Sequence, residues 1–163
     1  MSAEYAAELY VDAIAIEREA AERYAELAAR MDKEGNFAVA ALFRMLASLE
    51  AKHLQELERR TAGMKLPPLS VDYSWRDSEA PETVGRDLVR RGMTQRRALE
   101  IALQAEKRAR AFFEQVARVA GDPDVRALAQ EMAAEEAEHE VLIQRMLVRM
   151  SSTQRTGAAR CSG

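Results

Sequence analysis

The 163-residue sequence is poor in residues that break helices or form cross-links: it has one cysteine (Cys161), seven glycines and four prolines. A single cysteine excludes a disulfide within the chain, and it excludes a zinc or iron centre ligated by several of its own cysteines. The scarcity of cysteine is typical of a reducing compartment, so we expect a cytoplasmic protein. Few glycines and prolines among abundant alanine, glutamate, leucine and arginine favour helix.

The sequence also lacks a strong charge bias and a long apolar run. Its net charge is -3, and it has no stripe of lysine and arginine with interleaved aromatic residues, so we expect no nucleic-acid partner. The N-terminal stretch MSAEYAAELYVDAIA has acids where a signal peptide has lysines, and the apolar runs are too short to span a bilayer. We therefore expect no membrane partner, and the length indicates a single domain.

Four segments show the apolar spacing of amphipathic helices: residues 3–31, 37–62, 95–120 and 123–150. The breaks between them have turn residues, namely DKEGN after the first segment, Gly63 after the second and GDP after the third. Thr94 is suited to cap the third helix, and Pro123 is suited to the first position of the fourth.

About thirty residues, 63–93, connect the second helix to the third, whereas the other two connections take only a few residues. Short connections join antiparallel neighbours, so the sequence predicts an all-α four-helix bundle over residues 1–150. Two hairpins joined by one long crossover are typical of ferritin-like bundles. Residues 151–163 have no apolar pattern, and we expect a loosely ordered C-terminal tail.

The chain has only two histidines, and each follows a glutamate by three residues. Glu50 precedes His53 in LEAKHL, and Glu136 precedes His139 in EEAEHE. The two hairpins also repeat each other, because AIEREAAERYAELAAR aligns with QAEKRARAFFEQVARV and ALFRMLASLEAKHL aligns with ALAQEMAAEEAEHE. The repeat pairs Glu17 with Glu106, Tyr24 with Phe113, Glu50 with Glu136, and His53 with His139.

The four paired glutamates all fall on apolar helix faces. Residues three apart share one face of a helix, so each Glu-x-x-His pair points in a single direction, toward the flanking apolar residues. Each glutamate lies about 14 residues from the turn of its hairpin, a rise of roughly 21 Å at 1.5 Å per residue. We therefore expect four carboxylates and two imidazoles in one layer of the bundle.

Four buried carboxylates in one layer require positive charge if they are to stay ionised. Two divalent cations balance them, and carboxylate oxygen with imidazole nitrogen suits iron or manganese, with zinc as an alternative. Glutamates from two helices and a Glu-x-x-His from each of the other two form the ligand set of di-iron bundles. Two other interpretations stay open at this point: surface charges that share a spacing, or a buried hydrogen-bonded cluster without metal.

These motifs resemble those of the ferritin-like superfamily, and within it the rubrerythrin-related di-iron proteins, over residues from about 5 to 150. The resemblance implies that Tyr24 orients a ligand carboxylate through its hydroxyl, which its partner Phe113 lacks. It also implies that two iron ions are bound by Glu17, Glu50, His53, Glu106, Glu136 and His139.

The sequence departs from the rubrerythrin pattern at two points. The four-cysteine rubredoxin module that supplies electrons in rubrerythrins has no counterpart here, which implies an external electron-donor protein. Rubrerythrins also have a glutamate three residues after the third-helix ligand, where this chain has Ala109.

By this resemblance we expect a non-haem di-iron oxidoreductase that reacts with peroxide or oxygen, serves oxidative-stress defence and forms a homodimer. One alternative is a ferroxidase or other iron-handling protein, although the sequence gives no sign of a storage cage. A second alternative, of a different class, is a helical interaction protein that retains a relic metal site.

Overall fold

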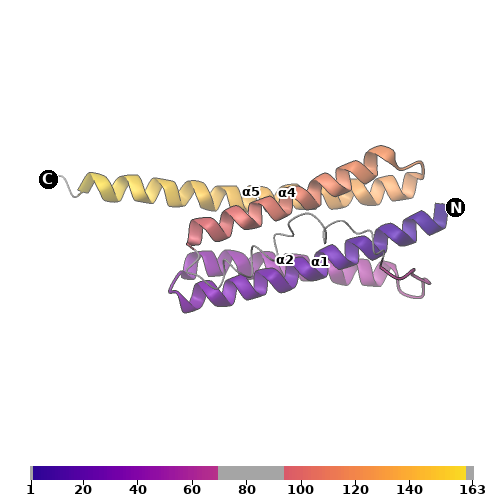
Figure 1. The fold of residues 1–163 in the computed structure, drawn as a ribbon, viewed down its shortest axis with the longest axis horizontal. Helices are drawn as coiled ribbons and strands as arrows, with labels where there is room; N and C mark the ends of the chain where they lie inside the picture. Colours follow the sequence, from indigo (N-terminus) through magenta and orange to yellow (C-terminus); the bar gives the residue numbers. More distant parts are fainter. Residues whose placement is uncertain (1, 70–93, 161–163) are drawn as a thin grey trace.

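The computed structural model describes residues 2–69 and 94–160, with side chains described for residues 6–69 and 94–152. Within these ranges the chain forms four helices: α1 (Ser2–Lys33), α2 (Phe37–Arg60), α4 (Gln95–Val119) and α5 (Pro123–Arg160). Figure 1 shows them as two hairpins, α1 with α2 and α4 with α5, which lie along each other. The predicted all-α four-helix architecture is confirmed.

The helix ends follow the turn chemistry of the sequence. After α1, Gly35 has a left-handed φ of 75°, and the Asn36 N–H donates to the carbonyl five residues before it at 2.8 Å, which closes the helix in a Schellman motif. The Thr94 hydroxyl accepts a hydrogen bond from a backbone N–H in the first turn of α4, as predicted for an N-cap. Pro123 is the first residue of α5, also as predicted.

The fourth helix is longer than predicted. α5 continues to Arg160, past the predicted helix end near residue 150, and the loose order expected for residues 151–163 stays a prediction. No proline interrupts this stretch, and the hydroxyls of Ser151 and Ser152 each donate to the backbone carbonyl four residues earlier. The helix continues here although the sequence of this stretch has no apolar stripe. Residues 161–163 lie outside the described residues.

Most of the predicted crossover, about 63–93, also lies outside the described part of the chain, which stops at residue 69 and resumes at residue 94. The two flanking helices show why the connection is long. α2 ends near the start of α1, whereas α4 begins at the opposite end of the bundle, near the α1–α2 turn (Figure 1). This arrangement makes α1 parallel to α5 and α2 parallel to α4.

The hydrophobic core consists of two clusters separated along the bundle axis. One lies toward the α1–α2 turn and includes Phe43 and Leu99, and the other lies toward the α4–α5 turn and includes Phe113 and Leu128. All four helices contribute to both clusters. On every helix, a buried glutamate falls between the residues of the two clusters: Glu17 on α1, Glu50 on α2, Glu106 on α4, and both Glu136 and Glu140 on α5.

The spacing of the helices leaves room for this polar layer. The backbones of α1 and α2 are closely paired along their length, as are those of α4 and α5, whereas the two hairpins approach each other at few backbone positions. Long side chains from all four helices can therefore meet between the hairpins. None of the four described helices is long and apolar enough to cross a membrane.

The packing predicts that replacement of Phe43 by alanine strongly destabilises the metal-free protein. Phe43 is fully buried and stacks on Tyr24 with ring centroids 5.9 Å apart. Loss of such a side chain lowers the free energy of unfolding by about 3–5 kcal/mol, measured by denaturant titration. Phe37→Ala is the matched control, because Phe37 is 68% exposed, and we expect a change within about 0.5 kcal/mol. Similar losses for both variants would contradict the assigned core.

Candidate metal centre

The residues predicted to bind metal converge between the two hairpins. They come from all four helices: Glu17, Glu50, His53, Glu106, Glu136 and His139. The four glutamates and His139 are each at most 3% exposed, whereas the side chain of His53 is 20% exposed. The burial of these side chains rules out the interpretation that they are solvated surface charges.

Four of these residues form an inner group around His139. The Nδ1 atom of His139 lies 3.0 Å from Glu50 Oε1, 3.5 Å from Glu106 Oε2 and 3.6 Å from Glu136 Oε2. One ligand atom from each of the four residues lies within 4.8 Å of the others. The inner group, Glu50, Glu106, Glu136 and His139, therefore has the proximity required to hold one ion.

Three residues form an outer group around His53, and Glu50 belongs to both groups. The Nδ1 atom of His53 lies 3.6 Å from Glu17 Oε2 and 3.8 Å from Glu50 Oε2. The rings of His53 and His139 stack with centroids 5.4 Å apart and an interplanar angle of 9°. Glu50 thus directs one oxygen toward each histidine, and it joins the outer group (Glu17, Glu50 and His53) to the inner group.

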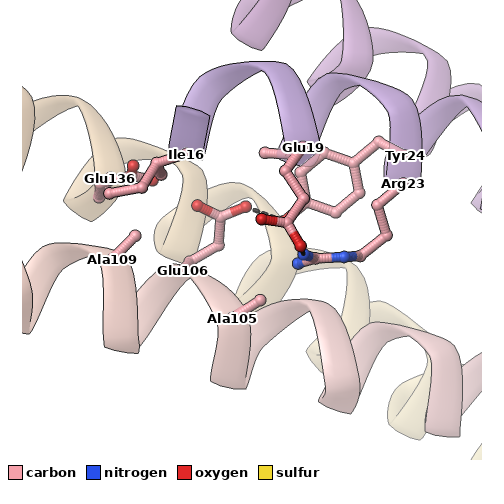
Figure 2. Close-up of a pocket in the computed structure, with 9 residues that line it drawn as sticks. Ile16, Glu19, Arg23, Tyr24, Ala105, Glu106, Ala109 and Glu136 are labelled. Carbon is pink, nitrogen blue, oxygen red and sulfur yellow. Dashed lines mark hydrogen bonds and ion pairs between the residues drawn. The ribbon is translucent and has the colours of Figure 1, made fainter. Parts of the chain in front are cut away.

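Tyr24 connects the hairpins at the edge of the inner group. Its hydroxyl donates a hydrogen bond from α1 to Glu106 Oε1 on α4 (Figure 2). Phe113, its partner in the internal repeat, is fully buried in the core cluster nearest the α4–α5 turn and has no hydroxyl. The predicted orienting role of Tyr24 is therefore supported by a direct contact with one of the six residues, and only one half of the repeat has it.

A small cavity adjoins Tyr24 and Glu106. It has a volume of about 20 Å³ and is lined by Ala105, Ala109 and Glu136 among others, beside the Glu19–Arg23 ion pair (Figure 2). A space of this size accommodates about one water molecule. Ala109, the position at which the sequence departs from the rubrerythrin pattern, contributes a small side chain to this space.

The cluster contains polar atoms that require partners. Both oxygens of Glu17 and of Glu50, and Nδ1 of His53 and of His139, are buried and have no hydrogen-bond partner among the described residues. Such atoms cost free energy unless something binds them. Ligand atoms about 2.1 Å from one ion lie about 3.0–3.4 Å apart, close to the separations in both groups. The residues present therefore fit a pair of divalent cations, and the donor types suit iron, manganese or zinc.

The pKa values show how the cluster is balanced without metal. Burial raises the pKa of Glu17 to about 9, against the opposing effect of His53, and burial also raises the pKa of Glu136 well above its ordinary value. Burial lowers the pKa of His53, but the carboxylates of Glu17 and Glu50 outweigh it and raise that pKa to about 10. Burial raises the pKa of Glu50, but His139 and His53 lower it to about 2. The metal-free cluster therefore holds protons, which metal binding must release.

Two further acids at this layer were not predicted from the sequence. Glu135 Oε1 lies 3.7 Å from His53 Nε2, and Glu140 is 6% exposed, with one oxygen 3.6 Å from Arg110. Glu135 precedes His139 by four residues, so helical spacing could have placed it near the layer. Its proximity to His53, on the other hairpin, has no local signal in the sequence.

The fold and the site together define a ferritin-like four-helix bundle with a buried glutamate–histidine cluster able to hold metal. The Rubrerythrin family model matches residues 8–86 and 97–160, and the chain belongs to the rubrerythrin family. It is similar to an uncharacterized conserved protein from Magnetospirillum magnetotacticum MS-1, known from a crystal structure at 2.00 Å resolution. The two are 36% identical, with a TM-score of 0.75, and the match covers 88% of this chain and 93% of that one. Among curated proteins, none matches this sequence.

The raised pKa values predict that the metal-free protein loses stability as pH rises. Glu17 has a pKa of about 9 in the folded state and 4.5 ordinarily, and His53 has about 10 against 6.5. The folded state therefore binds more protons than the unfolded state, and the free energy of unfolding falls between about pH 5 and pH 9. Glu50, with its lowered pKa, changes stability only below about pH 4.5. Urea titrations across this pH range measure how steeply the free energy of unfolding falls with pH, and Glu17→Gln makes this fall shallower. A free energy of unfolding that rises with pH would contradict the raised pKa values of Glu17 and His53.

The contact between Tyr24 and Glu106 predicts a specific effect of removing one hydroxyl. In Tyr24→Phe, a buried carboxylate oxygen loses its donor, so we expect the metal-free protein to lose about 1–3 kcal/mol of stability. Metal affinity should fall by about 10–100-fold, as for other groups that orient a ligand. Tyr10→Phe is the control, because Tyr10 is on the same helix but packs against a hydrophobic cluster and not in the glutamate–histidine cluster. Equal affinities for the two variants in a metal titration would show that Tyr24 has no orienting role.

Proposed function

We propose that this chain is a non-haem di-iron protein that reduces hydrogen peroxide or dioxygen. The observation that carries the proposal is the position of Glu50. Its Oε1 lies 3.0 Å from Nδ1 of His139, and its Oε2 lies 3.8 Å from Nδ1 of His53. A buried carboxylate directed at two separate donor groups is suited to bridge two ions. Two divalent ions would also balance the charge of the four glutamates at the centre.

The protein residues around this centre have complementary roles in the proposed reaction. When bound, a pair of ferrous ions supplies two electrons, which with two protons convert hydrogen peroxide into two molecules of water. Tyr24 holds Glu106 in place, and the hydrophobic clusters on both sides exclude water from the layer. The cavity of about 20 Å³ beside Glu106 and Glu136 is small, which agrees with a substrate as small as peroxide or dioxygen.

Each reduction of peroxide would leave the centre oxidised by two electrons, so a reductant must restore it. The sequence has one cysteine, which is too few for a rubredoxin-type or iron–sulfur centre ligated by several of its own cysteines. We therefore include an external electron-donor protein in the proposal.

Iron binding is the first test. We expect anaerobic titration of the metal-free protein with Fe(II) to saturate at two ions per chain, and Glu50→Ala to bind fewer because both groups lose a ligand. Glu58→Ala is the matched control on the same helix, since its side chain is 52% exposed and its ion pair with Arg18 is worth little. A wild-type protein without tight iron binding would remove the basis of the proposal.

The second test separates peroxide reduction from iron handling. The Fe(II)-loaded protein should consume about one hydrogen peroxide per two iron ions, faster than Fe(II) in buffer, because each ferrous ion gives one electron. If dioxygen reacts but peroxide does not, and sedimentation shows a large cage that accumulates ferric iron, the protein is a ferroxidase instead. If iron binds and neither oxidant reacts faster than in buffer, the centre has no such redox role.

A further inference from the structure

The two nitrogens of His53 face different carboxylates. Nδ1 lies near Glu17 and Glu50 of the same hairpin, at 3.6 and 3.8 Å. Nε2 lies 3.7 Å from Oε1 of Glu135, which comes from α5 in the other hairpin. Ligand atoms of Glu17, His53 and Glu135 lie within 4.8 Å of one another. Each ring nitrogen of His53 therefore has its own carboxylate neighbours, Glu17 and Glu50 at Nδ1 and the outer carboxylate of Glu135 at Nε2.

This outer carboxylate has no equivalent in the other half of the repeat. The alignment of the two Glu-x-x-His helices places Leu49 opposite Glu135, and a leucine side chain accepts no hydrogen bond. The two histidines also differ in burial. The side chain of His53 is 20% exposed, whereas that of His139 is 3% exposed. The two histidines are equivalent in sequence and inequivalent in their surroundings.

The side chain of Glu135 is available for a contact with His53. It is 31% exposed and therefore retains room to turn. Arg60, the cation nearby on α2, donates its hydrogen bonds to Glu131 and Glu56. The separation of 3.7 Å exceeds hydrogen-bond length, so the hydrogen bond requires the Glu135 side chain to turn toward Nε2.

We infer that Glu135 is a positioning residue for the outer metal position. It accepts a hydrogen bond from the Nε2–H of His53, which fixes the tautomer with Nδ1 directed at the ion and makes the imidazole a stronger ligand. The inference rests on the proposed metal binding and goes beyond it, because it makes the two metal positions unequal. The outer position depends on Glu135, whereas the inner group, built around His139, does not.

The test is a titration of metal-free protein with Co(II), compared among wild type, Glu135→Ala and Glu135→Gln. In Glu135→Ala, one Co(II) binds as in wild type, and the affinity for the other falls by about 10–100-fold. Glu135→Gln restores part of the loss, because its amide oxygen still accepts a hydrogen bond but has no charge. Glu138→Ala, an exposed glutamate on the same helix, retains wild-type affinity for both ions.

Proton NMR of the Co(II)-loaded protein provides a readout that general destabilisation does not mimic. An imidazole N–H beside bound Co(II) gives an exchangeable resonance far outside the normal range, one for each histidine. In Glu135→Ala the resonance of His53 is lost or shifted, because its proton has no acceptor and exchanges with water, while the resonance of His139 is unchanged. The melting temperature of the metal-free variant stays near that of wild type, since Glu135 is partly exposed.

The outcomes separate the inference from the proposed function. If wild type binds two Co(II) ions and Glu135→Ala binds them equally well, the positioning role is wrong and the metal centre stands. If the variant weakens both ions equally, Glu135 acts on the whole cluster, and the inequality of the two positions is refuted. If wild type binds no Co(II) and no Fe(II), the proposed function itself fails, and this inference fails with it.

Discussion

The confinement of four carboxylates and two imidazoles to one buried layer is the constraint on which the rest of the structure depends. Such groups are stable away from water only if protons or cations compensate their charge. The layer divides the hydrophobic core into two clusters, each built by all four helices. These clusters supply the apolar burial that offsets the cost of the polar layer, and they hold its side chains in register from both sides.

The same constraint explains why the site lies between the hairpins and not within either one. Close backbone pairing inside each hairpin leaves little space for long side chains, while the wider gap between hairpins admits them. Each hairpin brings one lone glutamate and one Glu-x-x-His to the gap, so neither completes the cluster alone. Cations at this layer would also link the hairpins, because ligands such as Glu50 and Glu106 come from different ones.

The fold and the convergence of the six predicted side chains could be predicted because both are encoded by local spacing. The distance of Glu50 from His53, the periodic apolar faces and the capping residue Thr94 are properties of single helices. Two features could not be read in this way. α5 continues past Ser151 to Arg160 in a stretch whose sequence has no apolar pattern. The approach of Glu135 to His53 depends on how one hairpin packs on the other, which no spacing along a single helix specifies.

The departures from internal symmetry carry more functional information than the repeat itself. The repeat by itself would build two equal halves, but Tyr24 contacts Glu106 while its counterpart Phe113 can donate nothing. Ala109 is a departure of another kind, because the repeat pairs it with Ala20 and it breaks the rubrerythrin pattern instead. It is 4% exposed and lines the small cavity next to Glu106. A longer acidic side chain at this position would add a further negative charge and fill the space. The alanine leaves a volume of about one water molecule beside a fixed carboxylate. The proposed reaction with a small oxidant would need a space of this kind, beside a carboxylate to which Tyr24 donates a hydrogen bond.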